Sequence, residues 1–150
     1  MTKIAVVYYS ATGNIAAMAN AIGEGAASVG AEVRVRRVAE TAPADAIASN
    51  PKWQAHFDEM ANEPLATLDD LEWADGIALG SPTRFGGPAS QLKSFLDTTG
   101  GLWFKGGPGY TKFVHVDIKF FNKSIGKFGW SSILLGGAIY YFIIYISNIH

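Results

Sequence analysis

Residues 10–14, Ser-Ala-Thr-Gly-Asn, carry the residue types of a phosphate-binding loop. Short hydroxyl side chains, a glycine and backbone N–H groups stand directly before a predicted helix, so several donors and the helix dipole can converge on an anion. The spacing is neither the Gly-x-x-x-x-Gly-Lys of an NTPase nor the Gly-x-Gly-x-x-Gly of a dinucleotide-binding Rossmann site. The pattern favours a ligand with a single phosphate, and an ordinary capped turn is the alternative.

A second cluster of residues that could bind a ligand is Pro-Thr-Arg-Phe-Gly at positions 82–86. It lies in a predicted loop over residues 81–88 that follows a short apolar run. Thr83 offers a hydroxyl, Arg84 a guanidinium and Phe85 an aromatic face, which together suit the border of a planar ring. Taken alone, Phe85 is equally a core residue and Arg84 a solvated charge. Two such loops at one sheet edge favour the binding interpretation.

The composition excludes several other chemistries. The 150 residues include no cysteine, which rules out disulfides, thiolate metal sites, cysteine nucleophiles and cysteine-ligated iron–sulfur clusters. The net charge is −1 without a long run of like charges, so nucleic acid is not an expected partner. We assign no metal site, and we predict that His56 is a surface or loop histidine and not a proton shuttle.

Alternating strands and helices must position the two loops. Residues 3–9 predict a central strand, and apolar residues spaced three and four apart predict a helix that Gly30 ends. Valine and arginine alternate in residues 32–38, as in a strand near a sheet edge, and residues 76–80 predict a buried strand. The predicted fold is α/β, a doubly wound parallel sheet that binds ligands at the carboxyl ends of its strands.

The connections between these elements differ in length. Residues 39–64 are predicted to be a long surface excursion with one short helix near residues 53–60. Thr67 and Asp70 have the spacing of a capping box and predict a short helix through Leu71. A further helix is predicted after the second loop from the apolar stripe of Leu92, Phe95 and Leu96.

Segments at residues 4–10, 11–15, 80–86 and 97–103 together resemble the WrbA-type NAD(P)H:quinone oxidoreductases, a flavodoxin-like family. The resemblance covers about residues 1–105. It implies an FMN-binding domain that catalyses the two-electron reduction of quinones to hydroquinones by NADH or NADPH and assembles as a homotetramer. The amino terminus lacks the apolar stretch and cleavage site of a signal peptide, so we expect a cytoplasmic protein.

By position, the resemblance also assigns roles to residues. Residues 10–15 would hold the FMN phosphate, with Thr12 also near the nicotinamide cofactor. The flavin carries the difficult chemistry, so no catalytic protein residue is assigned. The predicted cofactor-binding residues are Ser10, Ala11, Thr12, Gly13, Asn14, Ile15, Thr83, Arg84 and Phe85, the last three lining the isoalloxazine ring, and Trp103 is the predicted quinone-binding residue.

Residues 106–150 differ from the flavodoxin-like core predicted for residues 1–105. Alanine and arginine almost vanish there, and residues 128–149 contain no charged residue. The family's Ser/Thr/Gly-rich loop that wraps the flavin is absent, so we expect the fold to be incomplete or altered at this end. Three interpretations stand: a foreign continuation that leaves a defective oxidoreductase, a less favoured membrane anchor over residues 128–149, and a buried strand at residues 139–146 that completes the sheet. Residues 110–121 can also be drawn as a strand.

Two other functions remain open at the level of sequence. One is a flavodoxin-type electron carrier, which would bind FMN and pass single electrons to a protein partner. Arg84 and the segment around Trp103 argue against it, because acidic residues around the flavin would favour a carrier. The other is a non-catalytic remnant of the family.

Overall fold

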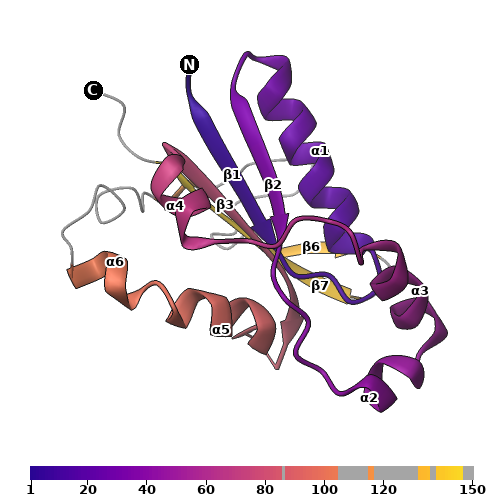
Figure 1. The fold of residues 1–150 in the computed structure, drawn as a ribbon. Helices are drawn as coiled ribbons and strands as arrows, with labels where there is room; N and C mark the ends of the chain where they lie inside the picture. Colours follow the sequence, from indigo (N-terminus) through magenta and orange to yellow (C-terminus); the bar gives the residue numbers. More distant parts are fainter. Residues whose placement is uncertain (86, 105–114, 117–131, 136–137, 147–150) are drawn as a thin grey trace.

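A computed structural model describes residues 1–85, 87–104, 115–116, 132–135 and 138–146. The strands are β1 Lys3–Tyr8, β2 Glu32–Arg37, β3 Gly76–Arg84, β4 Gly87–Pro88, β5 His115–Val116, β6 Ser132–Leu135 and β7 Ala138–Ile146. The helices are α1 Asn14–Ser28, α2 Ala44–Ala48, α3 Pro51–Glu59, α4 Leu68–Trp73, α5 Ser90–Asp97 and α6 Gly100–Phe104. The main path of the sheet runs β2-β1-β3-β7-β5, with β4 paired to β3 and β6 paired to β7 (Figure 1).

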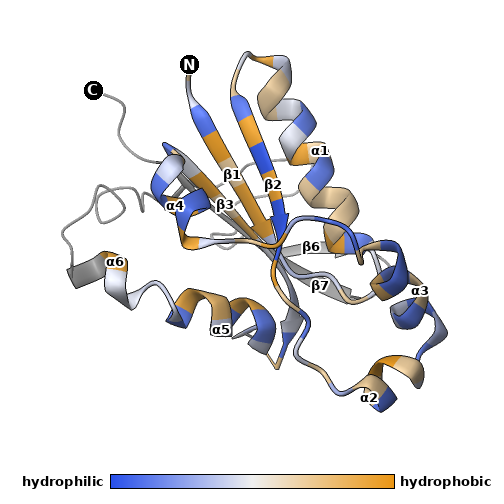
Figure 2. Cartoon of the chain, in the orientation of Figure 1, coloured by the Kyte–Doolittle hydropathy of each residue, from blue (hydrophilic) through white to orange (hydrophobic). Residues whose placement is uncertain are grey.

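Strand β1 lies at the centre of the parallel part of the sheet, between β2 and β3. Its side chains alternate between two buried clusters: Ala5 and Val7 belong to one, and Val6 and Tyr8 belong to the other. This alternation explains why the strand is apolar on both faces. The edge strand β2 instead alternates apolar and polar residues, visible as orange and blue bands in Figure 2.

Helices cover both faces of the sheet, which confirms the doubly wound α/β fold. Ile15 and Ala19 of α1 pack in the cluster of Val6 and Tyr8, whereas α4 and α5 contribute to the cluster on the opposite face. The sequence correctly places α1 from the spacing of Ile15, Met18, Ile22 and Ala26. The buried stripe is rotated slightly from these residues, because small residues let the helix approach the sheet. The buried residues of α1 are Ile15, Ala16, Ala19 and Gly23, with Met18 and Ile22 at the margin.

The excursion over residues 39–64 holds two helices, α2 and α3, where one was predicted. Asn50 caps the amino-terminal end of α3: its side chain accepts hydrogen bonds from the N–H groups of Lys52 at 3.1 Å and Trp53 at 3.4 Å. Pro51 occupies the first helical position, where its missing N–H costs nothing.

The capping box predicted for α4 is present. The Asp70 N–H donates to Thr67 Oγ1 at 3.3 Å, and the Thr67 N–H donates to Asp70 Oδ2 at 3.1 Å. Asp70 is buried, and its carboxylate also pairs with Arg34 at 3.1 Å and Arg36 at 3.3 Å. The cap therefore fixes α4 to the polar side of β2.

The described part of the chain after residue 104 continues the same sheet in a different direction. Strand β7 pairs antiparallel with β3, from Gly76 opposite Ile146 to Pro82 opposite Tyr140. The expected parallel order therefore holds for β2, β1 and β3, and β7 departs from it by pairing antiparallel with β3. The strand predicted at residues 139–146 is confirmed as β7; of residues 110–121, only β5 is described.

The stretch considered as an anchor, residues 128–149, includes β6 and β7. Among the residues that the structure describes, no helix is both long and apolar enough to cross a membrane.

Candidate functional site

The loop between β1 and α1 has the backbone geometry of an anion site. Gly13 has a left-handed φ of 94° at the N-cap of α1, and its N–H donates to Ser10 Oγ at 3.1 Å. Ala11 and Ile15 are buried and hold the two ends of the loop, while Thr12 is exposed. Gly13 has no side chain to cap the helix, and the first turn of α1 contains no acidic residue, so N–H donors remain for a phosphate.

The second loop differs from the prediction for residues 81–88. Residues 81–84 continue β3, because β7 pairs with them as far as Pro82, and the chain then reverses into β4 with Thr83 opposite Pro88. Ser81 Oγ closes the base of this hairpin by accepting a hydrogen bond from the Ala89 N–H at 2.8 Å. The predicted open loop is therefore a short hairpin that projects beyond the end of β1.

The hairpin presents Thr83, Arg84 and Phe85 in different environments. Thr83 Oγ1 is buried and has no hydrogen-bond partner among the residues that the structure describes, which is costly unless a ligand supplies one. Arg84 is exposed, and Phe85 is fully exposed with a positive φ of 49°, an unusual conformation for a bulky residue. An unsatisfied hydroxyl beside an exposed ring and guanidinium fits a ligand-binding edge.

Both loops lie at the same edge of the sheet, as the sequence predicts. Tyr8 pairs with Gly80 at the ends of β1 and β3, and the Tyr9 N–H donates to the Gly80 carbonyl at 2.9 Å. Trp103 lies on α6, but its side chain is outside the described residues, so its contact with a quinone stays a prediction.

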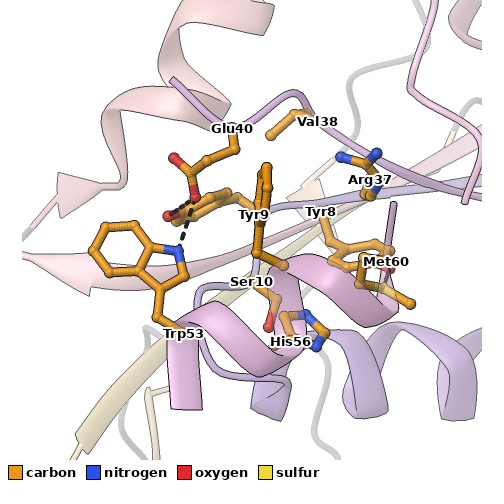
Figure 3. Close-up of a pocket in the computed structure, with 10 residues that line it drawn as sticks. Tyr8, Tyr9, Ser10, Arg37, Val38, Glu40, Trp53, His56 and Met60 are labelled. Carbon is orange, nitrogen blue, oxygen red and sulfur yellow. Dashed lines mark hydrogen bonds between the residues drawn. The ribbon is translucent and has the colours of Figure 1, made fainter. Parts of the chain in front are cut away.

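Behind this edge, the carboxylate of Glu40 joins four segments of the chain. It accepts hydrogen bonds from the Tyr9 hydroxyl at 2.8 Å and from Trp53 Nε1–H at 3.0 Å (Figure 3). It also accepts a hydrogen bond from Gln91 Nε2 at 2.7 Å. The N–H groups of Thr41 and Ala42 donate to it at 2.9 Å. The excursion is thereby tied to β1 and α5, a function the sequence did not reveal.

The hydrogen bonds to Glu40 shift the pKa values of Glu40 and Tyr9 in opposite directions. Burial would raise the pKa of Glu40, but the hydrogen bonds donated to its carboxylate outweigh burial and lower this pKa. Burial and the same hydrogen bond raise the pKa of Tyr9, and the nearby Arg84 guanidinium opposes that rise.

The prediction that His56 is a surface or loop histidine is wrong. His56 lies on α3, is only 9% exposed, and sits with Ser10 at a small cavity between α3 and β1 (Figure 3). Helical spacing places His56 on the same face as Trp53, three residues before it, which was the available signal. The cavity has a volume of about 20 Å³, room for one water molecule, so any flavin must lie on the open edge outside it.

Comparison with known proteins adds a family to this geometry. A family model described as NADPH-dependent FMN reductase matches residues 2–115, which include both loops. The chain belongs to the NADPH-dependent FMN reductase family. The match confirms the resemblance stated from the sequence, and in this family member the two loops follow β1 and β3.

Curated relatives support the same assignment. Proteins named NAD(P)H dehydrogenase (quinone) from Deinococcus radiodurans and Azorhizobium caulinodans are 50% identical over 104 residues and 52% identical over 106 residues. These matches cover 69% and 71% of this chain, and 52% and 51% of the relatives. A third, from Gluconacetobacter diazotrophicus, is 48% identical over 106 residues, 71% of this chain and 51% of its own. The chain thus spans about half the length of the relatives it matches.

Proposed function

We propose that this chain binds FMN at the carboxyl edge of β1 and β3 and uses it to reduce quinones with NADH or NADPH. The observation that carries the proposal is the meeting of two features at one edge: the uncapped, left-handed turn at Gly13 and the buried, unpartnered hydroxyl of Thr83. The family description and the names of the relatives supply the chemistry of the ligand and the reaction.

The residues present fit the parts of FMN. The backbone of residues 10–15 would hold the phosphate, since the loop offers N–H donors and the amino-terminal end of a 15-residue helix. The Thr83 hydroxyl would form a hydrogen bond with the isoalloxazine ring, while Arg84 and Phe85 would border that ring. Trp103 is proposed to contact the quinone.

The chemistry that FMN supplies when bound is two-electron transfer, so NAD(P)H and one proton convert a quinone to a hydroquinone with release of NAD(P)⁺. The chain's own part is to orient the rings and exclude water. No side chain is assigned as a proton donor or acceptor.

We also propose that this chain holds flavin less tightly than a family member in which a Ser/Thr/Gly-rich loop wraps the flavin. Strand β7 lies antiparallel beside β3, and the sequence contains no Ser/Thr/Gly-rich loop to wrap the flavin. Gel filtration of FMN-loaded protein should therefore release free flavin. Flavin that stays with the protein through the column would contradict this part of the proposal.

The decisive experiment is a titration of the purified full chain with FMN, followed by flavin fluorescence, and then NADH- and NADPH-driven reduction of benzoquinone. Riboflavin, which lacks the phosphate, is the matched ligand. We expect FMN to bind more tightly than riboflavin and turnover to require added FMN. Absence of FMN binding would overturn the proposed function. Binding of FMN without quinone turnover would instead indicate a flavodoxin-type electron carrier.

A further inference from the structure

His56 is a buried titratable group that the proposed function does not use. Its side chain is 10% exposed, and within the described part of the chain its ionic neighbour is Glu59, with His56 Nδ1 to Glu59 Oε2 at 3.7 Å and the Glu59 side chain 75% exposed. Burying an imidazole on the inner face of a short helix removes its hydration, so the position of this ring in the fold calls for an explanation.

The position of His56 is set by the Glu40 carboxylate. Trp53 donates to Glu40 at 3.0 Å, and this bond fixes the rotation of α3 about its axis. Residues three apart on a helix share a face, so His56 is carried toward the loop after β1. Two further partners of Glu40, Tyr9 and Gln91, anchor the same carboxylate to β1 and α5.

The imidazole of His56 lies on the side of Gly13 where a side chain would project. A Cβ atom built on Gly13 would lie 3.5 Å from Nδ1 and 3.8 Å from Cε1 of His56, which is ordinary van der Waals distance. The small cavity beside the ring, about 20 Å³, has room for about one water molecule. The left-handed turn at Gly13 therefore faces the ring of His56 on the α3 side.

We propose that His56 is a positioning residue that holds the phosphate loop in its binding conformation and thereby gives the chain its preference for FMN over flavins without a phosphate. The inference rests on the proposed function, because it concerns the same phosphate site. His56 acts through Gly13 and is not assigned a contact with the ligand.

The first test compares His56→Ala with the unmodified full chain in titrations with FMN and riboflavin. We expect FMN affinity to fall about tenfold, the lower end of what loss of an outer-shell support costs at metal sites. Riboflavin affinity should not change, because a loosened phosphate loop does not affect a ligand without phosphate. Phe57→Ala is the control, since it removes an aromatic side chain that is 41% exposed from the next position of α3. Its FMN-to-riboflavin ratio should stay at the starting value.

The second test needs no flavin. Hydrogen exchange of the Gly13 amide, which donates to Ser10 Oγ at 3.1 Å, should be faster in His56→Ala and unchanged in Phe57→Ala. His56→Gln, a smaller change, takes the place of His56→Ala in both tests if the alanine variant does not fold.

The outcomes separate the two proposals. A chain that binds no FMN before mutation would overturn the proposed function, and the exchange experiment would still decide whether His56 holds Gly13. Normal FMN binding with the same FMN-to-riboflavin ratio in the His56 variants would overturn the role of His56 alone. An equal loss of affinity for both flavins would also overturn it, because that result indicates general loss of structure.

Discussion

Gly13 is the residue on which the proposed phosphate site depends most directly. Its φ of 94° is disfavoured for residues with a side chain, and a β-branched side chain would also meet the ring of His56. We expect Gly13→Val to abolish FMN binding, measured by quenching of flavin fluorescence.

Gly30 provides the matched control for Gly13. It too has a left-handed φ, 87°, but nothing lies within 4 Å of a Cβ built there. Gly13→Val and Gly30→Val should each lose about 1–2 kcal/mol of stability or more from backbone strain. Only the first should lose FMN. Undiminished FMN affinity in Gly13→Val would contradict the site assignment.

Glu40 predicts a specific dependence of stability on pH. Its pKa is lowered in the folded state, so its contribution to stability is fully present above the unfolded pKa of about 4.3 and is lost as the pH falls through the folded value. Urea unfolding of the unmodified chain should therefore show a free energy of unfolding that decreases from about pH 5 downward. Glu40→Gln should be less stable at neutral pH and show a shallower decrease.

Glu24→Gln, an exposed carboxylate of α1, is the control for Glu40→Gln. Its stability curve against pH should follow that of the unmodified chain. Parallel curves for the Glu40 variant and the unmodified chain would show that the hydrogen bonds to Glu40 contribute nothing to acid sensitivity.

At the scale of the element, α1 carries two glycines with opposite predicted effects. A Cβ on Gly23 would lie 2.8 Å from Val35 Cγ2, and the β-branched side chain of Val35 cannot easily turn away. Gly23→Ala should therefore lower the free energy of unfolding by roughly 1–3 kcal/mol. Gly25 has nothing within 4 Å, so Gly25→Ala should raise it by about 0.5–1 kcal/mol through helix propensity.

Urea unfolding of both variants checks this pair. Equal effects of the two substitutions would indicate that α1 does not pack against β2 as closely as the 2.8 Å approach requires. A stabilised Gly23→Ala variant would have the same meaning.

At the scale of the whole molecule, β7 determines whether the sheet is continuous beyond β3. Ile143 lies opposite Leu79 in the antiparallel pair, and β7 has β3 on one side and β5 on the other. A proline there removes a backbone donor from an interior strand. Ile143→Pro should therefore destabilise the chain by more than the ~1 kcal/mol typical of a point mutation.

Ile143→Val keeps the backbone donor and the β-branched shape, so it should cost less stability than the proline substitution. Thermal unfolding of both variants is the measurement. If the proline variant unfolds at the same temperature as the valine variant, the pairing of β7 with β3 does not stabilise the fold.

The sequence by itself determined the elements whose signals are local. The apolar run of β1, the valine and arginine alternation of β2, and the Thr67–Asp70 capping box each depend on residues within a few positions of one another. The glycine loop before α1 is local in the same sense. These features therefore predicted the parallel core and the edge where the two loops meet.

Only the tertiary structure decided how distant segments meet. The approach of His56 to the Gly13 turn, the hydrogen bond of Gln91 to Glu40 and the antiparallel pairing of β7 with β3 bring together residues far apart in the chain. Periodicity shows which face of an element is apolar, but it carries no information on which partner covers that face or in which direction a strand enters the sheet. Packing of the chain selects those partners, and it buries a histidine that the sequence predicted at the surface.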